Sequence, residues 1–121
     1  MKVLRIIADI NADDLNKAGG FYRDVLGLEL AMDHGWIRTY TSTAKMTVQV
    51  SVATEGGSGT PVPYLSVEVD DLDEALRKIT EAAISIEYGP AREPWGVRRF
   101  YVRDPFGKLI NVLQHNHADG P

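Results

Sequence analysis

Alternation of apolar and polar residues predicts a strand, a helix and three more strands in the first half of the chain. Residues 3–10 alternate with a period of two, which places Leu4 and Ile6 on one face of a half-buried strand and Ile7 on the other. Apolar residues then recur at spacings of three and four, which predicts a helix from about Asp13 to Leu26. Gly27 is the expected C-terminal cap of this helix. The expected strands that follow are Leu28–Asp33, Trp36–Thr41 and Thr47–Val52.

The second half repeats this order. An alternating strand from Tyr64 to Val69 precedes Asp71 and Glu74, whose spacing resembles a capping box at the start of a helix. Three strands then follow, and turns are expected at three sites: His34-Gly35, Gly89-Pro90 and the Asp104-Pro105-Phe106-Gly107 segment. The predicted strands of this half are Ile84–Tyr88, Val97–Arg103 and Leu109–Gln114.

The two halves also share sequence. Residues 7–18, IADINADDLNKA, align with residues 64–75, YLSVEVDDLDEA, at an offset of 57 residues. A repeat of this length that occurs twice indicates a duplicated supersecondary module. The sequence therefore predicts one domain with module one at about 1–54, a link at 55–62, module two at about 63–115 and a loose tail at 116–121. The Gly/Ser/Pro-rich stretch Thr54–Pro63 is expected to be a flexible link.

Composition narrows the classes of function. A chain of 121 residues with 44% hydrophobic residues is long enough to bury the core of one domain. It has no cysteine, which removes disulfides and thiolate chemistry. The net charge of −4 is spread without a basic stripe, so nucleic acid is not an expected partner. No apolar run is long enough to span a membrane and no signal peptide is evident, so a cytoplasmic location is expected.

Three segments carry a resemblance to a known family. FYRDVLGLEL at residues 21–30, VEVDDLDEAL at 67–76 and PWGVRRFYVRDPFGKLINVLQH at 94–115 are similar to the glyoxalase, bleomycin-resistance and extradiol-dioxygenase superfamily, the vicinal oxygen chelate proteins. This resemblance implies an α+β fold of two βαβββ modules. Each module would curl a mixed sheet into a half-cup with a helix on its outer face, and a ligand or metal would lie between the cups. Members usually pair as homodimers.

The resemblance also locates the family's four metal-ligand positions. They fall on residues that are not the usual His or Glu: Ile7, Gln49, Tyr64 and Asn111. Divalent cations prefer carboxylate or carbonyl oxygens and transition metals prefer imidazole, so no metal and no other cofactor is expected. His34 is expected in a turn and His115 near the tail, so neither histidine is expected to replace the missing metal ligands. The favoured interpretation of His115 is a solvated tail residue.

A ligand site is instead predicted on the sheet faces away from the helices. Strand alternation brings Ile7 and Asp9 to this face in module one, and Tyr64 and Glu68 in module two. Such a mixed apolar and polar face suits a small-molecule pocket or a dimer interface equally well. Asp9 and Glu68 would favour a cationic guest.

Two tryptophans and one arginine complete the predicted site. Trp36 and Arg38 share one face of the third strand, and Trp95 lies in a Pro-Trp-Gly loop. Both tryptophans could also be core residues. Arg38 would favour a carboxylate.

The leading hypothesis is a homodimeric, metal-free binding protein that sequesters a toxic or antibiotic compound. Trp36 and Trp95 would stack on the ligand, and Gln49, Tyr64 and Asn111 would form neutral hydrogen bonds. The alternative is a lyase, isomerase or dioxygenase with a rearranged site, in which Tyr64 or Glu68 serves as acid or base. A third hypothesis is an interaction module without a ligand.

Overall fold

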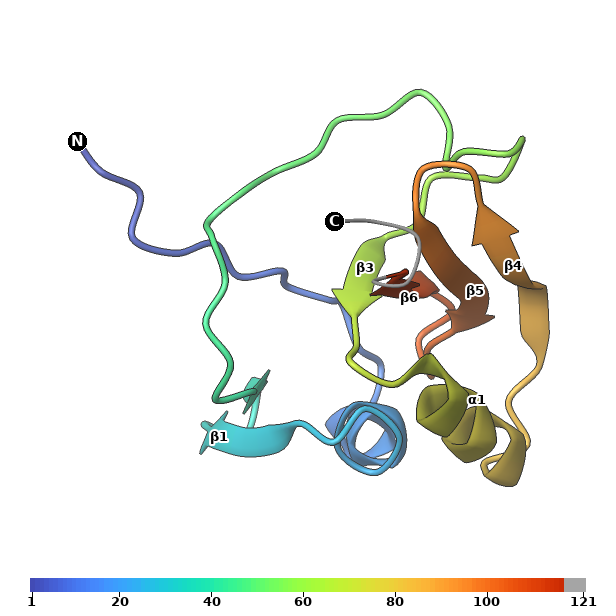
Figure 1. Cartoon of the computed structure of the whole chain (residues 1–121). Helices are drawn as coiled ribbons and strands as arrows, with labels where there is room; N and C mark the ends of the chain where they lie inside the picture. The colour runs from blue at the N-terminus through green and yellow to red at the C-terminus, as the bar shows by residue number, and fades with distance from the viewer. Residues whose placement is uncertain (117–121) are drawn as a thin grey trace. The chain divides into compact units, whose positions relative to one another are not determined.

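The computed structural model describes residues 1–116 and confirms the predicted α+β class (Figure 1). The chain separates into two compact units, residues 1–54 and residues 55–121, of which the second is described up to residue 116. Within residues 1–116, no helix has the length and apolar character needed to cross a membrane.

The second unit has the predicted βαβββ order. Its elements are β3 (Leu65–Glu68), α1 (Leu72–Glu81), β4 (Ile86–Glu93), β5 (Val97–Arg103) and β6 (Leu109–His115). The four strands form one mixed sheet in the order β3-β6-β5-β4, with β3 parallel to β6 and the other pairs antiparallel. The parallel pair follows from the helical crossover between β3 and β4, which lets the chain return on the far side of the sheet.

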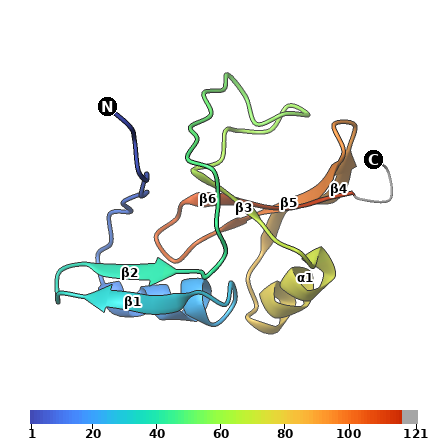
Figure 2. The same ribbon diagram turned by 60° about the vertical axis from the view of Figure 1, so that its left-hand side comes forward.

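Helix α1 covers one face of this sheet (Figure 2). Its start is the predicted cap, because the Asp71 side chain accepts a hydrogen bond of 3.1 Å from the backbone N–H of Glu74. The Leu72 N–H donates to Gln114 Oε1 on β6 at 2.8 Å. The apolar side chains on the helical face are fully buried and form the core of the unit: Leu72, Ile79, Phe100, Val102, Ile110 and Val112. Burial of each contributes about 1.5–3 kcal/mol to stability.

The other face of the sheet carries the polar residues. Because side chains alternate along a strand, residues on either side of each core residue point away from α1. Strand pairing aligns Ser66, Asn111, Tyr101 and Tyr88 in one row across the four strands. We call the face formed by Ser66, Glu68, Tyr88, Arg99, Tyr101 and Asn111 the non-helical face.

The first unit departs from prediction in its helix. Instead of one α-helix over residues 13–26, the chain forms a 3₁₀ turn, η1 (Leu15–Lys17), and a π-helix, η2 (Gly19–Arg23). The π geometry is set by i to i+5 hydrogen bonds, such as that from the Asp24 N–H to the Gly19 carbonyl at 2.9 Å. The two glycines at positions 19 and 20 relax the backbone enough to permit this. Gly27, with φ of 74°, ends the segment as predicted.

Two predicted strands of the first unit are absent from the described residues. Only β1 (Glu29–Asp33) and β2 (Arg38–Thr41) pair, as an antiparallel hairpin closed by the predicted turn at His34-Gly35. Residues 3–10 and 47–52 form no ladder, and all their apolar side chains except that of Ile10 are exposed. Alternation defines the two faces of a strand, but a strand also needs a partner for its backbone groups, and within residues 1–116 these segments pair with none.

One predicted turn of the second unit is also wrong. Gly89-Pro90 lies inside β4, which continues to Glu93 through a shift in its pairing register with β5. Gly89 has φ of 83°, and a Cβ there would lie 2.5 Å from the carbonyl oxygen of Arg99. The glycine therefore marks a bulge with close backbone approach rather than a chain reversal. The turn at Asp104–Gly107 is confirmed, with the Asp104 carboxylate accepting from the Phe106 and Lys108 N–H groups.

Candidate functional site

The sequence-predicted site residues divide between the two units. Ile7, Asp9 and Gln49 lie in exposed segments of the first unit that have no regular structure. Trp36, in the turn before β2, is 77% exposed, so the interpretation of Trp36 as a core residue is wrong. Arg38 on β2 forms an ion pair with Asp33 at 3.1 Å. The structure does not gather these five residues into a common site within the first unit.

Four predicted residues belong to the second unit; two of them lie on neighbouring strands and a third directly precedes one of these strands. Tyr64 precedes β3, and the ammonium nitrogen of Lys108 lies 5.2 Å from the centre of its ring. Glu68 ends β3 and Asn111 is central in β6. Trp95 lies in the turn between β4 and β5 and is 51% exposed. The polar residues therefore lie on the sheet and the tryptophan at its edge.

Asn111 is the most unusual of the four. It is 7% exposed, and its side-chain N–H donates to Ser66 Oγ at 3.1 Å, but no described group donates to its buried Oδ1. Turning the amide over would pair the oxygen with Ser66 and leave the nitrogen unpaired instead. A buried polar atom without a partner costs about 1–3 kcal/mol, so Asn111 has an unused hydrogen-bonding group on the non-helical face.

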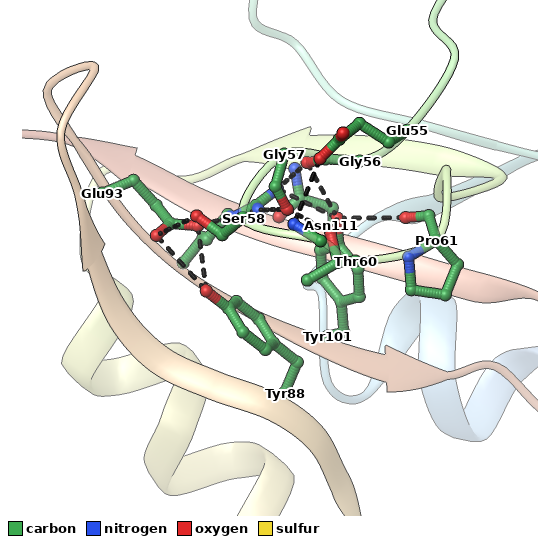
Figure 3. Close-up of polar contacts among 12 residues, drawn as sticks. Glu55, Gly56, Gly57, Ser58, Thr60, Pro61, Tyr88, Glu93, Tyr101 and Asn111 are labelled. Atoms are coloured by element: carbon green, nitrogen blue, oxygen red, sulfur yellow. Dashed lines mark hydrogen bonds and ion pairs between the residues drawn. The ribbon is translucent and has the colours of Figure 1, made fainter.

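The Gly/Ser/Pro-rich segment, expected to be a flexible link, is folded and hydrogen-bonded to the sheet of the second unit. Residues 55–61, here called the strap, fold into a turn in which the Gly56 N–H donates to the Thr60 carbonyl at 2.8 Å. The Tyr101 hydroxyl on β5 lies 2.9 Å from Thr60 Oγ1 and 3.3 Å from the Pro61 carbonyl oxygen (Figure 3). The composition indicated a mobile segment because glycine and serine side chains contribute little free energy on burial. The backbone carbonyl groups of the segment, however, accept hydrogen bonds from side chains of the sheet.

A buried ion pair holds the strap against the non-helical face. The Arg99 guanidinium contacts the Glu93 carboxylate through Nε and Nη2, each at 2.7 Å, and both side chains are about 95% buried. Arg99 Nη1 donates to the Gly56 carbonyl at 2.8 Å and Nη2 to the Gly57 carbonyl at 3.1 Å. Ser58 Oγ donates to Glu93 at 3.1 Å (Figure 3). The pair therefore connects β4, β5 and the strap.

The environment of Glu93 favours its ionised form. Burial raises the pKa of the Glu93 carboxyl, but hydrogen bonds from Arg99, Ser58 and Tyr88 outweigh this and bring the pKa below its ordinary value. The guanidinium carbon of Arg99 also lies 5.0–5.4 Å from the ring centres of Tyr88, Trp95 and Tyr101. Charge and aromatic contact thus stabilise one fixed arginine conformation.

Neither Arg99 nor His115 is among the sequence-predicted site residues. Arg99 alternates with Tyr101 on β5, and this shared face was the only available signal. His115, expected to be a solvated tail residue, ends β6, and its Nδ1 lies 2.7 Å from Glu68 Oε2. Both members of this pair are more than half exposed. The remainder of the predicted tail from residue 117 onward lies outside the described residues.

The residues at the family's metal positions do not fit a cation. Among residues 1–116, no group of three or more His, Asp or Glu side chains could hold a metal ion. Of the four positions, Asn111 directs an N–H toward Ser66, and Tyr64 is adjacent to the Lys108 ammonium. Ile7 has no donor atom and Gln49 has a neutral amide, so the set supplies no carboxylate or imidazole.

Comparison with known proteins assigns the family. The profile of the Glyoxalase/Bleomycin resistance protein/Dioxygenase superfamily matches residues 4–112, and the chain belongs to this superfamily. The match includes both units and all nine sequence-predicted site residues. None of the curated proteins with which the sequence was compared matches it.

Several solved structures have the same fold. TnmS3, an antibiotic binding protein from Streptomyces sp. CB03234, is 23% identical, with a TM-score of 0.64 over 88% of this chain and 90% of that one. A lactoylglutathione lyase from Agrobacterium tumefaciens is 26% identical, with a TM-score of 0.59 over 85% of this chain and 87% of that one. A superfamily member from Sphaerobacter thermophilus DSM 20745 is 24% identical, with a TM-score of 0.62 over 89% and 94%. Proteins with this fold thus include an antibiotic binding protein and a lyase.

Proposed function

We propose that this chain is a metal-free binding protein for small aromatic compounds, and that it acts as a cytoplasmic homodimer that sequesters a toxic or antibiotic molecule. The ligand would stack on tryptophan and form hydrogen bonds to neutral side chains. Nucleic acid and membranes are not part of the proposal. In this function affinity comes from burial of apolar surface, and no bond of the ligand is broken.

The observation that carries the proposal is the unpaired amide of Asn111. A folded protein seldom keeps a buried polar atom without a partner unless a ligand, ion or water supplies one. The four metal-ligand positions lack charge, so an ion is the poorest candidate. A neutral ligand with a hydroxyl or amine group could donate to Asn111 Oδ1 and complete its hydrogen bonding, and Tyr64 and Gln49 offer similar neutral chemistry.

The exposed tryptophans support an aromatic ligand. Trp95 is 51% exposed and Trp36 is 77% exposed, so each presents an indole surface that the protein does not bury. Large exposed aromatic side chains are typical of sites that are covered on binding. TnmS3, which has the same fold, is an antibiotic binding protein, and this supports the same class of ligand here.

The first unit supports a homodimer. Its residues 3–7 and 46–52 carry large apolar side chains that are 37–96% exposed: Val3, Leu4, Ile6, Ile7, Met46, Val48, Val50 and Val52. These segments also have strand-like alternation without a strand partner among residues 1–116. A second copy of the chain would bury the apolar side chains and supply backbone hydrogen bonds at once.

A ligand screen tests the proposal. Aromatic antibiotics and planar dyes are titrated into the protein, and binding is read from tryptophan fluorescence and from the shift in melting temperature. For a compound that binds, Asn111→Leu should weaken binding about 10-fold, because one hydrogen bond to the ligand is lost. The same variant should keep wild-type stability, since an apolar side chain of equal size replaces a half-satisfied amide. Failure of every compound to bind, or unchanged affinity in Asn111→Leu, would contradict the proposal.

The pair of His115 and Glu68 favours a second candidate, an enzyme of the lyase or isomerase type. A carboxylate that binds Nδ1 orients the imidazole and leaves Nε2 for proton transfer, with Glu68 in an acid-base role through the histidine. The similarity to a lactoylglutathione lyase points to the same class. Turnover of 2-oxoaldehyde hemithioacetals that is lost in His115→Gln would support this candidate over simple binding.

A further inference from the structure

We infer that Arg99 is a positioning residue: together with Glu93 and the strap it fixes the indole of Trp95 as a rigid wall for a flat aromatic ligand. The inference rests on the proposed function for the ligand, but the fixed indole can be tested without any ligand. Neither Arg99 nor Glu93 is among the residues expected to contact a ligand. Both are about 95% buried, so they act through Trp95.

The guanidinium is held on all its edges. Nε and Nη2 bind the Glu93 carboxylate, Nη1 binds the Gly56 carbonyl and the Tyr101 hydroxyl, and Nη2 also binds the Gly57 carbonyl. A planar group with acceptors in every direction has a single orientation. The arginine is therefore a fixed platform, unlike a surface arginine that samples many rotamers.

This platform lies against one side of Trp95. The guanidinium carbon is 5.0 Å from the centre of the Trp95 ring, within the range of a cation–π contact. The strap restrains the edge of the same ring, because a Cβ on Gly57 would lie 2.7 Å from Trp95 Cη2. The indole is thus restrained on one face and at its edge, and half of its surface remains exposed.

A rigid indole binds more tightly than a mobile one. Immobilising a mobile aromatic side chain on binding costs conformational free energy. A preorganised side chain was already immobilised when the protein folded, so binding does not carry this cost. The loss of this restraint should weaken binding by about two- to tenfold while Trp95 itself is still present. The wall suits a flat ring system, because stacking on one restrained face favours planar ligands.

The ligand-free test follows the motion of Trp95. Trp36 and Trp95 are the two tryptophans of the chain, so Trp36→Phe leaves Trp95 as the single tryptophan whose emission is followed. In this background, Glu93→Gln with Arg99→Met removes both buried charges together, which avoids a lone buried charge. We expect lower fluorescence anisotropy and about twofold stronger acrylamide quenching, as for a released side chain. Arg103→Met is the matched control, because Arg103 on the same strand pairs with Glu87 and the Gly107 carbonyl at the exposed surface.

A second pair of variants tests the contact between the strap and Trp95. Gly57→Ala introduces a Cβ against Trp95, whereas Gly59→Ala introduces one at a similar positive φ with no atom within 4 Å. Both variants carry the same kind of backbone strain, so only Gly57→Ala should change anisotropy and quenching. Wild-type values in both Gly57→Ala and the Glu93→Gln, Arg99→Met double variant would overturn the inference.

The ligand arm uses riboflavin and doxorubicin as planar probes, with dissociation constants from the fluorescence of the probes themselves. We call Gly57→Ala and the Glu93→Gln, Arg99→Met double variant the clamp variants. In them we expect a two- to tenfold higher Kd, and in the controls Gly59→Ala and Arg103→Met we expect wild-type affinity. If a probe binds and Trp95→Ala weakens it but the clamp variants do not, the inference is overturned and the proposed function stands. If no planar compound binds the wild type, the proposed function fails, and the anisotropy measurements still decide whether Arg99 positions Trp95.

Discussion

The substitution Glu93→Gln should destabilise the protein strongly although the two side chains have nearly the same shape. The variant leaves the Arg99 guanidinium buried without a counter-charge, and the introduced amide would also present an N–H toward donors that now bind carboxylate oxygens. Breaking a buried ion pair from one side costs about 3–5 kcal/mol. For a chain of 121 residues this corresponds to a drop in melting temperature of roughly 10–20 °C.

The matched control is Glu87→Gln. Glu87 accepts from Arg103 at 2.7 Å in the same way, but the two side chains are 41% and 48% exposed. Exposed pairs of this kind contribute about 0–1 kcal/mol. Urea unfolding followed by circular dichroism gives both free energies. A loss below about 1 kcal/mol in Glu93→Gln would mean that water reaches the pair, and the argument from burial would be refuted.

The same carboxylate predicts a pH dependence. Burial raises the pKa of Glu93, but Arg99, Ser58 and Tyr88 lower it below its ordinary value of 4.5. A group whose pKa is lower in the folded state contributes stability above its unfolded pKa and loses it as the pH falls through the folded pKa. The free energy of unfolding of the wild type should therefore fall below pH 4.5, the ordinary pKa of this carboxyl, and Glu93→Gln should lack this part of the acid sensitivity. Parallel pH profiles for the two proteins would contradict the assigned cause.

Three further predictions follow from exposure and donor chemistry. Protein purified without an affinity tag should contain well under one equivalent of zinc, nickel, manganese or iron, and a chelator should leave its melting temperature unchanged. Light scattering at tens of micromolar should give about twice 13.4 kDa, and a monomer would contradict the proposed dimer. Trp36→Ala should cost less than about 1 kcal/mol because the indole is exposed, whereas Phe100→Ala should cost about 3–5 kcal/mol. A similar cost for the two variants would mean that Trp36 is covered in solution.

The second unit could be predicted well because its signals are local. The Asp71 cap, the alternation along β5 and β6, and the Asp104 turn each depend on residues close in sequence. The first unit could not, because its outer segments have the alternation of strands but lack a strand to pair with among the described residues. The glycines at positions 19 and 20 permit a π-helix, but whether it forms depends on packing that the sequence does not reveal.

The candidate site was predicted only in part, for a related reason. Alternation placed Glu68 on the face away from α1, whereas Asn111 was located through the resemblance to the family and lies beside Ser66 on the same face. The sequence did not identify Arg99 and Glu93 as site residues, because their partners in the strap lie 35–43 residues away along the chain. Two of these partners are backbone carbonyls, which no side-chain pattern encodes. The same contacts explain why a composition typical of a mobile link gave an ordered strap.

The strap also defines where the second unit begins. A boundary chosen from secondary structure would fall just before β3, near Tyr64, and would discard residues 55–61. Truncation there would remove the Gly56 and Gly57 carbonyls and leave Arg99 Nη1 and Nη2 without their backbone acceptors. The boundary between the two compact units therefore lies at Thr54–Glu55, and the glycine-rich segment belongs to the second unit. Domain exchange or gene fusion within this superfamily should succeed when it cuts before Glu55 and fail when it cuts inside the strap.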